Sequence, residues 1–203
     1  MEIDPNNRIN RIHKQFELFG SQDQFSSYFS NDDTLKHTKD TILNWRNKIY
    51  NHQKRILDIN NDFYIQKPLI QNEEILDIKK INPFLLKGIS VNFWRSNKKI
   101  HTGAAMYFVL DTIQNTQIIL YIGETNSADT RWKGYHDCKN YINNYKESLA
   151  QNNIDNHLDI RFFLDVPKEV RLRRKLEQKL IHLWLPPFNK ETRSRWSTTF
   201  TNN

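Results

Sequence analysis

The chain has 203 residues, of which 37% are hydrophobic and 12% aromatic, and this composition supports a buried core and excludes a wholly disordered chain. No apolar run approaches the roughly 20 residues that a membrane span needs, and the single cysteine, Cys138, excludes an internal disulfide and a multi-cysteine zinc site. The 30 Lys and Arg residues outnumber the 23 Asp and Glu residues and give a net charge of +7, which favours polyanionic partners such as nucleic acid. Residues 1–6 do not begin a secretory signal, so we expect a cytoplasmic protein that is not inserted in a membrane.

The first hundred residues are predicted to form a mainly helical accessory segment. A long helix is expected over residues 33–59, with Asp32 or Asp33 as its N-cap. Its apolar residues recur at helical spacing and are Leu35, Ile42, Trp45, Ile49, Ile56 and Ile59. This pattern breaks at Pro68, so residues 60–100 are expected to be short connecting elements that lead to a second domain over residues 101–203.

Two apolar and aromatic runs, residues 105–111 and 117–123, are predicted to form the strands of a hairpin. The intervening residues 112–116 have the composition of a hairpin loop. With that loop Asp111 would face Gln117, and Tyr107 would lie directly opposite Tyr121. The two phenols would then project from one face of the sheet, and a register slip of one residue would turn one of them to the other face.

Two helices and one further strand complete the predicted second domain. A helix is expected over residues 129–149 and a third strand over residues 158–164. A second helix would begin at Pro167, and Pro186 would end it at about Trp184. The candidate caps of the first of these helices are Ser127, Asp129 and Thr130. Together these elements indicate an α+β fold in which a small three-stranded antiparallel sheet is flanked by helices.

A series of short motifs lies between residues 103 and 190. In chain order they are Ala105-Met106-Tyr107, Tyr121-Ile122-Gly123, Arg131 ten residues beyond Tyr121, Tyr135 four residues later, Glu177 in the last predicted helix, and Asn189 twelve residues after it. In this order and spacing the domain resembles the GIY-YIG nuclease family. The chain departs from the family in its first motif, where Ala105 and Met106 replace glycine and isoleucine, and either Tyr135 or His136 can be the residue that faces the site.

The resemblance implies a metal-dependent DNA endonuclease that hydrolyses phosphodiester bonds with Mg²⁺ or Mn²⁺ as its cofactor. The residues that it places in the active site are Tyr107, Tyr121, Arg131, Tyr135, His136, Glu177 and Asn189. The alternative is a catalytically inactive nucleic-acid-binding module on the same fold. The motifs leave open the DNA specificity, the biological role and the oligomeric state.

The chemistry of phosphodiester hydrolysis agrees with these residue types. The carboxylate of Glu177 can hold Mg²⁺, which prefers oxygen ligands and keeps several waters. Arg131 offers a planar fork for phosphate oxygens. A tyrosine can orient the nucleophile, but an ordinary phenol with a pKa of about 10 is a poor base unless its surroundings lower that pKa.

Glu177 also has a purely structural alternative. It lies at the edge of the apolar stripe of its predicted helix, because Ile181 and Trp184 follow at i+4 and i+7. A carboxylate at such an edge needs a partner. That partner is either a metal, which we favour, or an ion pair with Arg173 or Arg174.

Basic residues near these motifs are the candidates for contacts with the DNA backbone, although a charged helix is more often only a solvated face. Arg131 would lie near the start of a helix, where the helix dipole disfavours a positive charge. A phosphate bound at the same place would compensate for this unfavourable interaction. The predicted nucleic-acid contacts are Arg131, Lys133, Arg171, Arg174 and Lys175. Cys138, His157 and His182 have no catalytic or metal-ligand spacing and are expected to be structural.

Overall fold

A computed structural model describes residues 38–63, 78, 81–95, 102–113, 116–134, 136–197 and 200. The compact unit that contains them runs from His37 to Asn203 and therefore includes segments on both sides of residue 100. The expected caps Asp32 and Asp33, the break at Pro68 and the candidate Tyr135 lie outside the described residues. Within the described ranges, no helix combines the length with the hydrophobicity that a membrane span requires.

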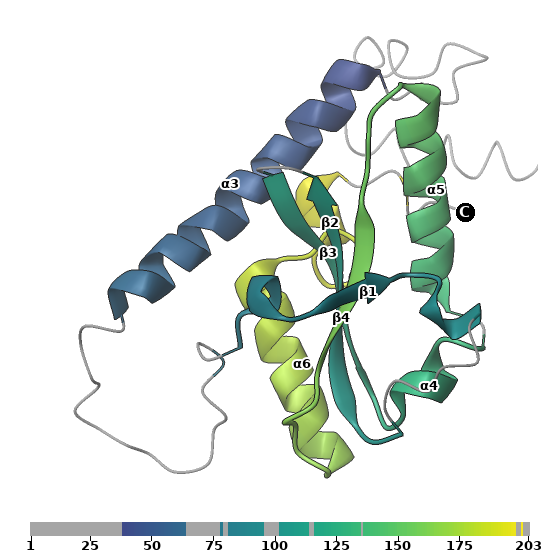
Figure 1. The fold of residues 1–203 in the computed structure, drawn as a ribbon. Helices are drawn as coiled ribbons and strands as arrows, with labels where there is room; N and C mark the ends of the chain where they lie inside the picture. Colours follow the sequence, from purple (N-terminus) through teal and green to yellow (C-terminus); the bar gives the residue numbers. More distant parts are fainter. Residues whose placement is uncertain are drawn as a thin grey trace, which may run out of the picture. The chain divides into compact units, whose positions relative to one another are not determined.

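The described fold is α+β, as the sequence predicts, and its sheet is antiparallel with the strand order β1-β4-β2-β3 (Figure 1). The strands are β1 (Gly88–Ser90), β2 (Ala105–Ile113), β3 (Thr116–Thr125) and β4 (Leu158–Phe163). The helices are α3 (Lys39–Phe63), α4 (Ala128–Arg131), α5 (Asp137–Gln151) and α6 (Val170–Trp184). Short 3₁₀ turns occur at η2 (Pro83–Leu85), η3 (Phe93–Arg95) and η4 (Arg193–Trp196).

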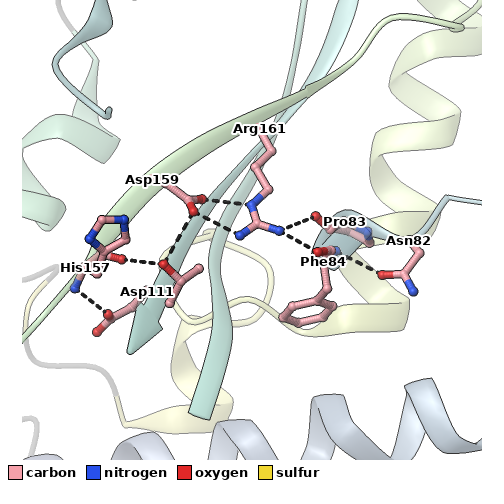
Figure 2. A network of polar contacts seen from close by, with 8 residues as sticks. Asn82, Pro83, Phe84, Asp111, His157, Asp159 and Arg161 are labelled. Carbon is pink, nitrogen blue, oxygen red and sulfur yellow. Dashed lines mark hydrogen bonds and ion pairs between the residues drawn. The ribbon is translucent and has the colours of Figure 1, made fainter. Parts of the chain in front are cut away.

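The expectation of three strands is wrong, because β1 adds a fourth at the edge of β4. Strand β1 pairs Ile89 with Ile160, and its three residues are too few to show an alternating pattern in the sequence. The preceding turn is held to β4 by the buried guanidinium of Arg161, whose Nη1 donates to the carbonyl oxygens of Pro83 and Phe84 at 3.2 and 2.7 Å (Figure 2). These long-range bonds and the backbone pairing with β4 position β1, and neither has a local signal in the sequence.

Helices cover both faces of the sheet. Along β2, Tyr107 and Val109 pack into one hydrophobic cluster, whereas Met106, Phe108 and Leu110 pack into the other. The first cluster takes the apolar side of α5, which includes Cys138, Tyr141, Ile142, Tyr145 and Leu149. The second takes Leu176, Leu180, Ile181 and Trp184 of α6. Burial of both faces explains why β2 is an almost uninterrupted apolar run.

The predicted hairpin is present, but its register differs from the expectation. Asp111 pairs with Ile118 and not with Gln117, because the strands continue to Ile113 and Thr116 and leave a shorter loop. A bulge between Val109 and Leu110 adds a second shift of one residue, so that Tyr107 pairs with Gly123. The two shifts sum to two residues. Since side chains alternate with a period of two, both tyrosines stay on one face of the sheet.

The single helix expected over residues 129–149 is wrong, because the segment forms α4 and α5 with a break between them. The break contains Gly134, which disfavours a helix interior, and it ends at His136, whose side chain caps α5 by accepting a hydrogen bond from the backbone of Cys138. The last helix begins at Val170 and not at Pro167, and it ends at Trp184 as predicted.

Strand β3 is an edge strand whose outward polar groups are occupied by side chains and a loop. Gln53 of α3 accepts from the backbone N–H of Ile119 at 2.8 Å and donates to its carbonyl at 3.0 Å. The N–H of Phe188 donates to the carbonyl of Leu120 at 3.0 Å. These bonds cover an edge that would otherwise be free to pair with another chain, and they bring α3 and the loop after α6 beside the candidate site.

Candidate active site

A pocket of about 250 Å³ gathers most of the residues that the sequence selects. Its lining includes Tyr121 of β3, Arg131 of α4, His136 at the cap of α5, Glu177 of α6 and Asn189 of the following loop. These residues are up to 68 positions apart (189 − 121), so only the folded chain brings them together. Tyr107 lies behind this lining and is 1% exposed.

The rings of Tyr107 and Tyr121 are stacked, with centroids 6.0 Å apart and an interplanar angle of 20°. This contact explains why the last residue of the second motif, Gly123, has no side chain. A Cβ atom at position 123 would lie 2.3 Å from Cζ of Tyr107, so a side chain there would collide with the ring. The buried tyrosine and the glycine opposite it therefore form one packing unit.

Both phenols are protonated at neutral pH. Burial, followed by the neighbouring Tyr121, raises the pKa of Tyr107 well above its ordinary value, and Arg131 lowers it only in part. Burial also raises the pKa of Tyr121, with smaller contributions from the charges of Cys138 and Glu177. The surroundings therefore make neither tyrosine a ready base, and both can act through hydrogen bonds.

His136 is 4% exposed and uses both ring nitrogens. Its Nε2 lies 2.7 Å from the hydroxyl of Tyr107, and its Nδ1 accepts from the backbone N–H of Cys138 at 3.1 Å. The ring stacks on Trp132 at a centroid distance of 5.3 Å and an angle of 18°. Burial lowers the pKa of His136 to about 4, and the nearby charge of Arg131 acts in the same direction. Of the two alternatives at this place, His136 reaches the pocket, whereas Tyr135 is not described.

Glu177 reaches the end of β3 and not one of its neighbouring arginines. Its Oε1 accepts from the backbone N–H of Glu124 at 3.0 Å, and it forms no ion pair with any residue in the described ranges. Burial raises its pKa to about 7, and the charges of Glu124 and Glu191 add to that rise, while the hydrogen bond from Glu124 and the more distant charge of Arg174 oppose it. The alternative in which Glu177 forms an ion pair with Arg173 or Arg174 is therefore wrong.

The arginines form their ion pairs with Glu124 instead. Nε of Arg173 lies 2.7 Å from Oε2 of Glu124, and Nε of Arg174 lies 3.5 Å from Oε1. Arg173 is fully buried and also donates to the carbonyl oxygens of Pro167 and Lys168, both at 3.0 Å. Sequence reasoning missed this anchor, because nothing local distinguishes Arg173 from the other cations of α6.

Asn189 braces the edge of the sheet. Its Oδ1 accepts from the backbone N–H of Ile122 at 3.0 Å, and its Nδ2 donates to the carbonyl of Ile122 at 2.8 Å. The amide thus replaces a neighbouring strand for the residue that directly follows Tyr121. Asn189 is 5% exposed, so its polar atoms depend on these two bonds.

The predicted cationic contacts are all at the surface. Arg131 is exposed in the last turn of α4 and not at a helix start, so the expected conflict with a helix N-terminus does not exist. The other four, Lys133, Arg171, Arg174 and Lys175, are also exposed. Arg131 alone among the five lines the pocket.

The pocket has a donor set that suits one hard divalent cation. Glu177 has a second oxygen, Oε2, with no hydrogen bond to any described residue, and this oxygen can serve as a ligand. In the described ranges no group of three or more His, Cys, Asp or Glu side chains gathers for a metal. One carboxylate with waters and phosphate oxygens is a coordination that Mg²⁺ accepts, so the residues fit this ion.

Comparison with known proteins gives no match: no family model, no curated protein and no solved structure is similar to this chain beyond chance. Only the geometry of the pocket and the motifs that supply its residues therefore bear on what this chain does.

Proposed function

We propose that this chain is a metal-dependent DNA endonuclease of the GIY-YIG type. One observation carries the proposal. Tyr121, Arg131, Glu177 and Asn189, which are four separate motif residues in the sequence, line the same pocket, and the fifth, Tyr107, stacks on Tyr121. A chance set of spaced residues would be scattered over the fold.

The side chains of the pocket supply complementary functions for hydrolysis. The guanidinium of Arg131 is exposed at the pocket and binds phosphate oxygens through two parallel N–H donors. The hydroxyl of Tyr121, protonated at neutral pH, hydrogen-bonds to the attacking water or to a phosphoryl oxygen. Asn189 holds the backbone next to Tyr121 in place and does not itself contact the reacting atoms.

Glu177 is the residue that would hold Mg²⁺ or Mn²⁺. An ion held there would supply neutralisation of charge on the phosphate and activation of a water molecule. Because its pKa is raised to about 7 by burial, the carboxylate of Glu177 is only partly ionised at neutral pH, and a divalent cation would favour the ionised form. The exposed cations of α6, including Arg171 and Lys175, would follow the DNA backbone without reading its sequence.

A cleavage assay with a panel of DNA forms tests the proposal. Purified protein is incubated with supercoiled, linear, nicked, flap and branched DNA in the presence of Mg²⁺ or Mn²⁺, and Glu177→Gln is the control for contaminating nucleases. We expect wild-type protein to cut at least one form and the variant to cut none. Salt-sensitive binding of DNA without cleavage of any form would contradict the proposal and support the inactive binding module.

A further inference from the structure

The hydrogen bonds of His136 determine where its proton resides. Nδ1 accepts from the backbone N–H of Cys138 at 3.1 Å, so that nitrogen carries a lone pair. A neutral imidazole has one protonated and one unprotonated nitrogen, and the proton must therefore be on Nε2. Nε2–H then donates to the hydroxyl oxygen of Tyr107, 2.7 Å away. The reverse direction would leave the ring with two acceptors and no proton.

The surroundings of His136 keep the ring in this state. Its neighbours are aromatic on three sides, with Trp132 stacked on it and the rings of Tyr107 and Tyr121 placed edge-on at 6.0 and 5.5 Å. The charged groups that act on it are Arg131, Asp137 and Lys139, of which only Asp137 favours protonation. His136 is therefore neutral across the range in which an exposed histidine titrates.

We propose that His136 is a positioning residue that directs the hydroxyl of Tyr107 toward Tyr121, and that it is not the proton acceptor of the reaction. This inference rests on the proposed function. The oxygen of Tyr107 accepts from Nε2–H of His136 and also has a side-chain hydrogen bond with Arg131, a group that can only donate. Its single O–H is therefore directed to Tyr121, with which Tyr107 forms a side-chain hydrogen bond and on which its ring is stacked at 6.0 Å. Tyr121 lines the pocket, so it is the end of this hydrogen-bonded series that faces substrate.

The cap of α5 makes the arrangement rigid. His136 is the N-cap of this helix, so the same ring that orients Tyr107 also terminates the break after α4. A substitution that removes the cap would disturb both the helix and the tyrosine. Asparagine separates the two roles, because its side-chain oxygen is a good N-cap acceptor but it has no atom that reaches the position of Nε2.

A direct measurement of the tautomer tests the proposal without reference to activity. Nitrogen-15 NMR of the full chain, with His136→Asn used to assign the signal, reports which nitrogen is protonated. We expect the proton on Nε2 at every pH from about 5.5 to 8, where an ordinary histidine with a pKa near 6.5 would titrate. A proton on Nδ1, or titration within that range, would overturn the inference even if the protein cleaves DNA.

A double-mutant cycle tests the coupling to Tyr107. We expect His136→Asn to lower kcat for cleavage by about 10- to 100-fold with less than about twofold change in KM, as for a misplaced reacting group. In the Tyr107→Phe background the same substitution should have no further effect, because the hydroxyl that it orients is absent. Full additivity of the two substitutions would contradict the inference. Lack of cleavage by wild-type protein would contradict the proposed function, while the NMR result would still decide the tautomer.

Discussion

Arg173 and Glu124 form a buried ion pair that fixes the end of β3. Nε of Arg173 lies 2.7 Å from Oε2 of Glu124, and the backbone N–H of this same Glu124 donates to Glu177 at 3.0 Å. The pair thus holds the strand end against which the candidate metal ligand rests. Since Arg173 is fully buried, its charge is compensated by Glu124, by two carbonyl oxygens and by a hydrogen bond to Asn126.

Arg173→Gln should be far more destabilising than Arg174→Gln, although both arginines lie near Glu124. Removing Arg173 leaves a carboxylate of 15% exposure without its close partner, and we expect a loss of about 3 kcal/mol in the free energy of unfolding. The side chain of Arg174 is 70% exposed and 3.5 Å from the carboxylate, so its loss should cost below about 1 kcal/mol. Denaturant unfolding of both variants measures the difference, and equal losses would contradict the assigned partners.

Glu177→Gln should abolish cleavage and leave DNA binding unchanged or slightly tighter. The substitution removes the ligand oxygen and a negative charge near phosphate, while the amide oxygen can still accept from Glu124. Cleavage and binding assays at one salt concentration test this pair of outcomes. Normal metal-dependent cleavage by the variant would place the metal on other residues.

The effect of Glu177→Gln on the free energy of unfolding should depend on pH. The pKa of Glu177 is raised from 4.5 in the unfolded chain to about 7 in the fold, so the folded state binds the proton more tightly. Ionisation of Glu177 therefore lowers the free energy of unfolding. This destabilisation is complete above pH 7 and disappears as the pH falls toward 4.5. We expect Glu177→Gln to gain stability relative to wild type at pH 8 and to lose most of that gain at pH 5. An equal difference at both pH values in denaturant unfolding would be inconsistent with the raised pKa.

The two tyrosines should differ when each loses its hydroxyl. Tyr107→Phe leaves Nε2–H of the buried His136 without an acceptor, and we expect a loss of about 1–3 kcal/mol in the free energy of unfolding. Tyr121→Phe keeps the stacked ring and removes a hydroxyl at the pocket, so it should reduce turnover with little change in stability or DNA binding. Unfolding and cleavage measurements on both variants test this contrast. A larger loss of stability for Tyr121→Phe than for Tyr107→Phe would contradict it.

Gly123→Ala should damage the site through packing alone. The added Cβ would lie 2.3 Å from Cζ and from the hydroxyl of Tyr107, a residue that is 1% exposed and cannot move freely. We expect a loss of about 2 kcal/mol, typical of overpacked cores, together with loss of cleavage. Gly134→Ala is the control, since a Cβ there meets nothing within 4 Å. Equal stability of the two variants would show that Tyr107 is not confined.

Removal of two charges from α6 should weaken DNA binding independently of sequence. Arg171→Gln with Lys175→Gln removes two exposed cations, and the slope of log K against log salt should flatten by about one for each lost phosphate contact. Lys48→Gln with Lys146→Gln makes the same change in net charge on α3 and α5. If the control pair flattens the slope equally, binding depends on net charge and not on the α6 surface.

The hairpin shows how far a sequence pattern can predict a site. The prediction that Tyr107 and Tyr121 share a face is confirmed by their stacking, although the predicted register is wrong. The face of the sheet from which a side chain projects depends only on whether the register shift is an odd or an even number of residues. The register itself depends on the turn and on the bulge at Val109 and Leu110. Neither the turn nor the bulge has a clear local signal.

Local patterns in the sequence are sufficient to predict the α+β class, the three main strands, the end of α6 at Trp184 and the face that the two tyrosines share. These features follow from periodicity and from proline and glycine, which act over a few residues. Three contacts could not be predicted in this way: Gln53 and Asn189 cover β3, Arg173 pairs with Glu124, and His136 is hydrogen-bonded to Tyr107. Such partners are 29 to 67 residues apart, and a buried polar group takes whichever partner the packed fold brings within reach.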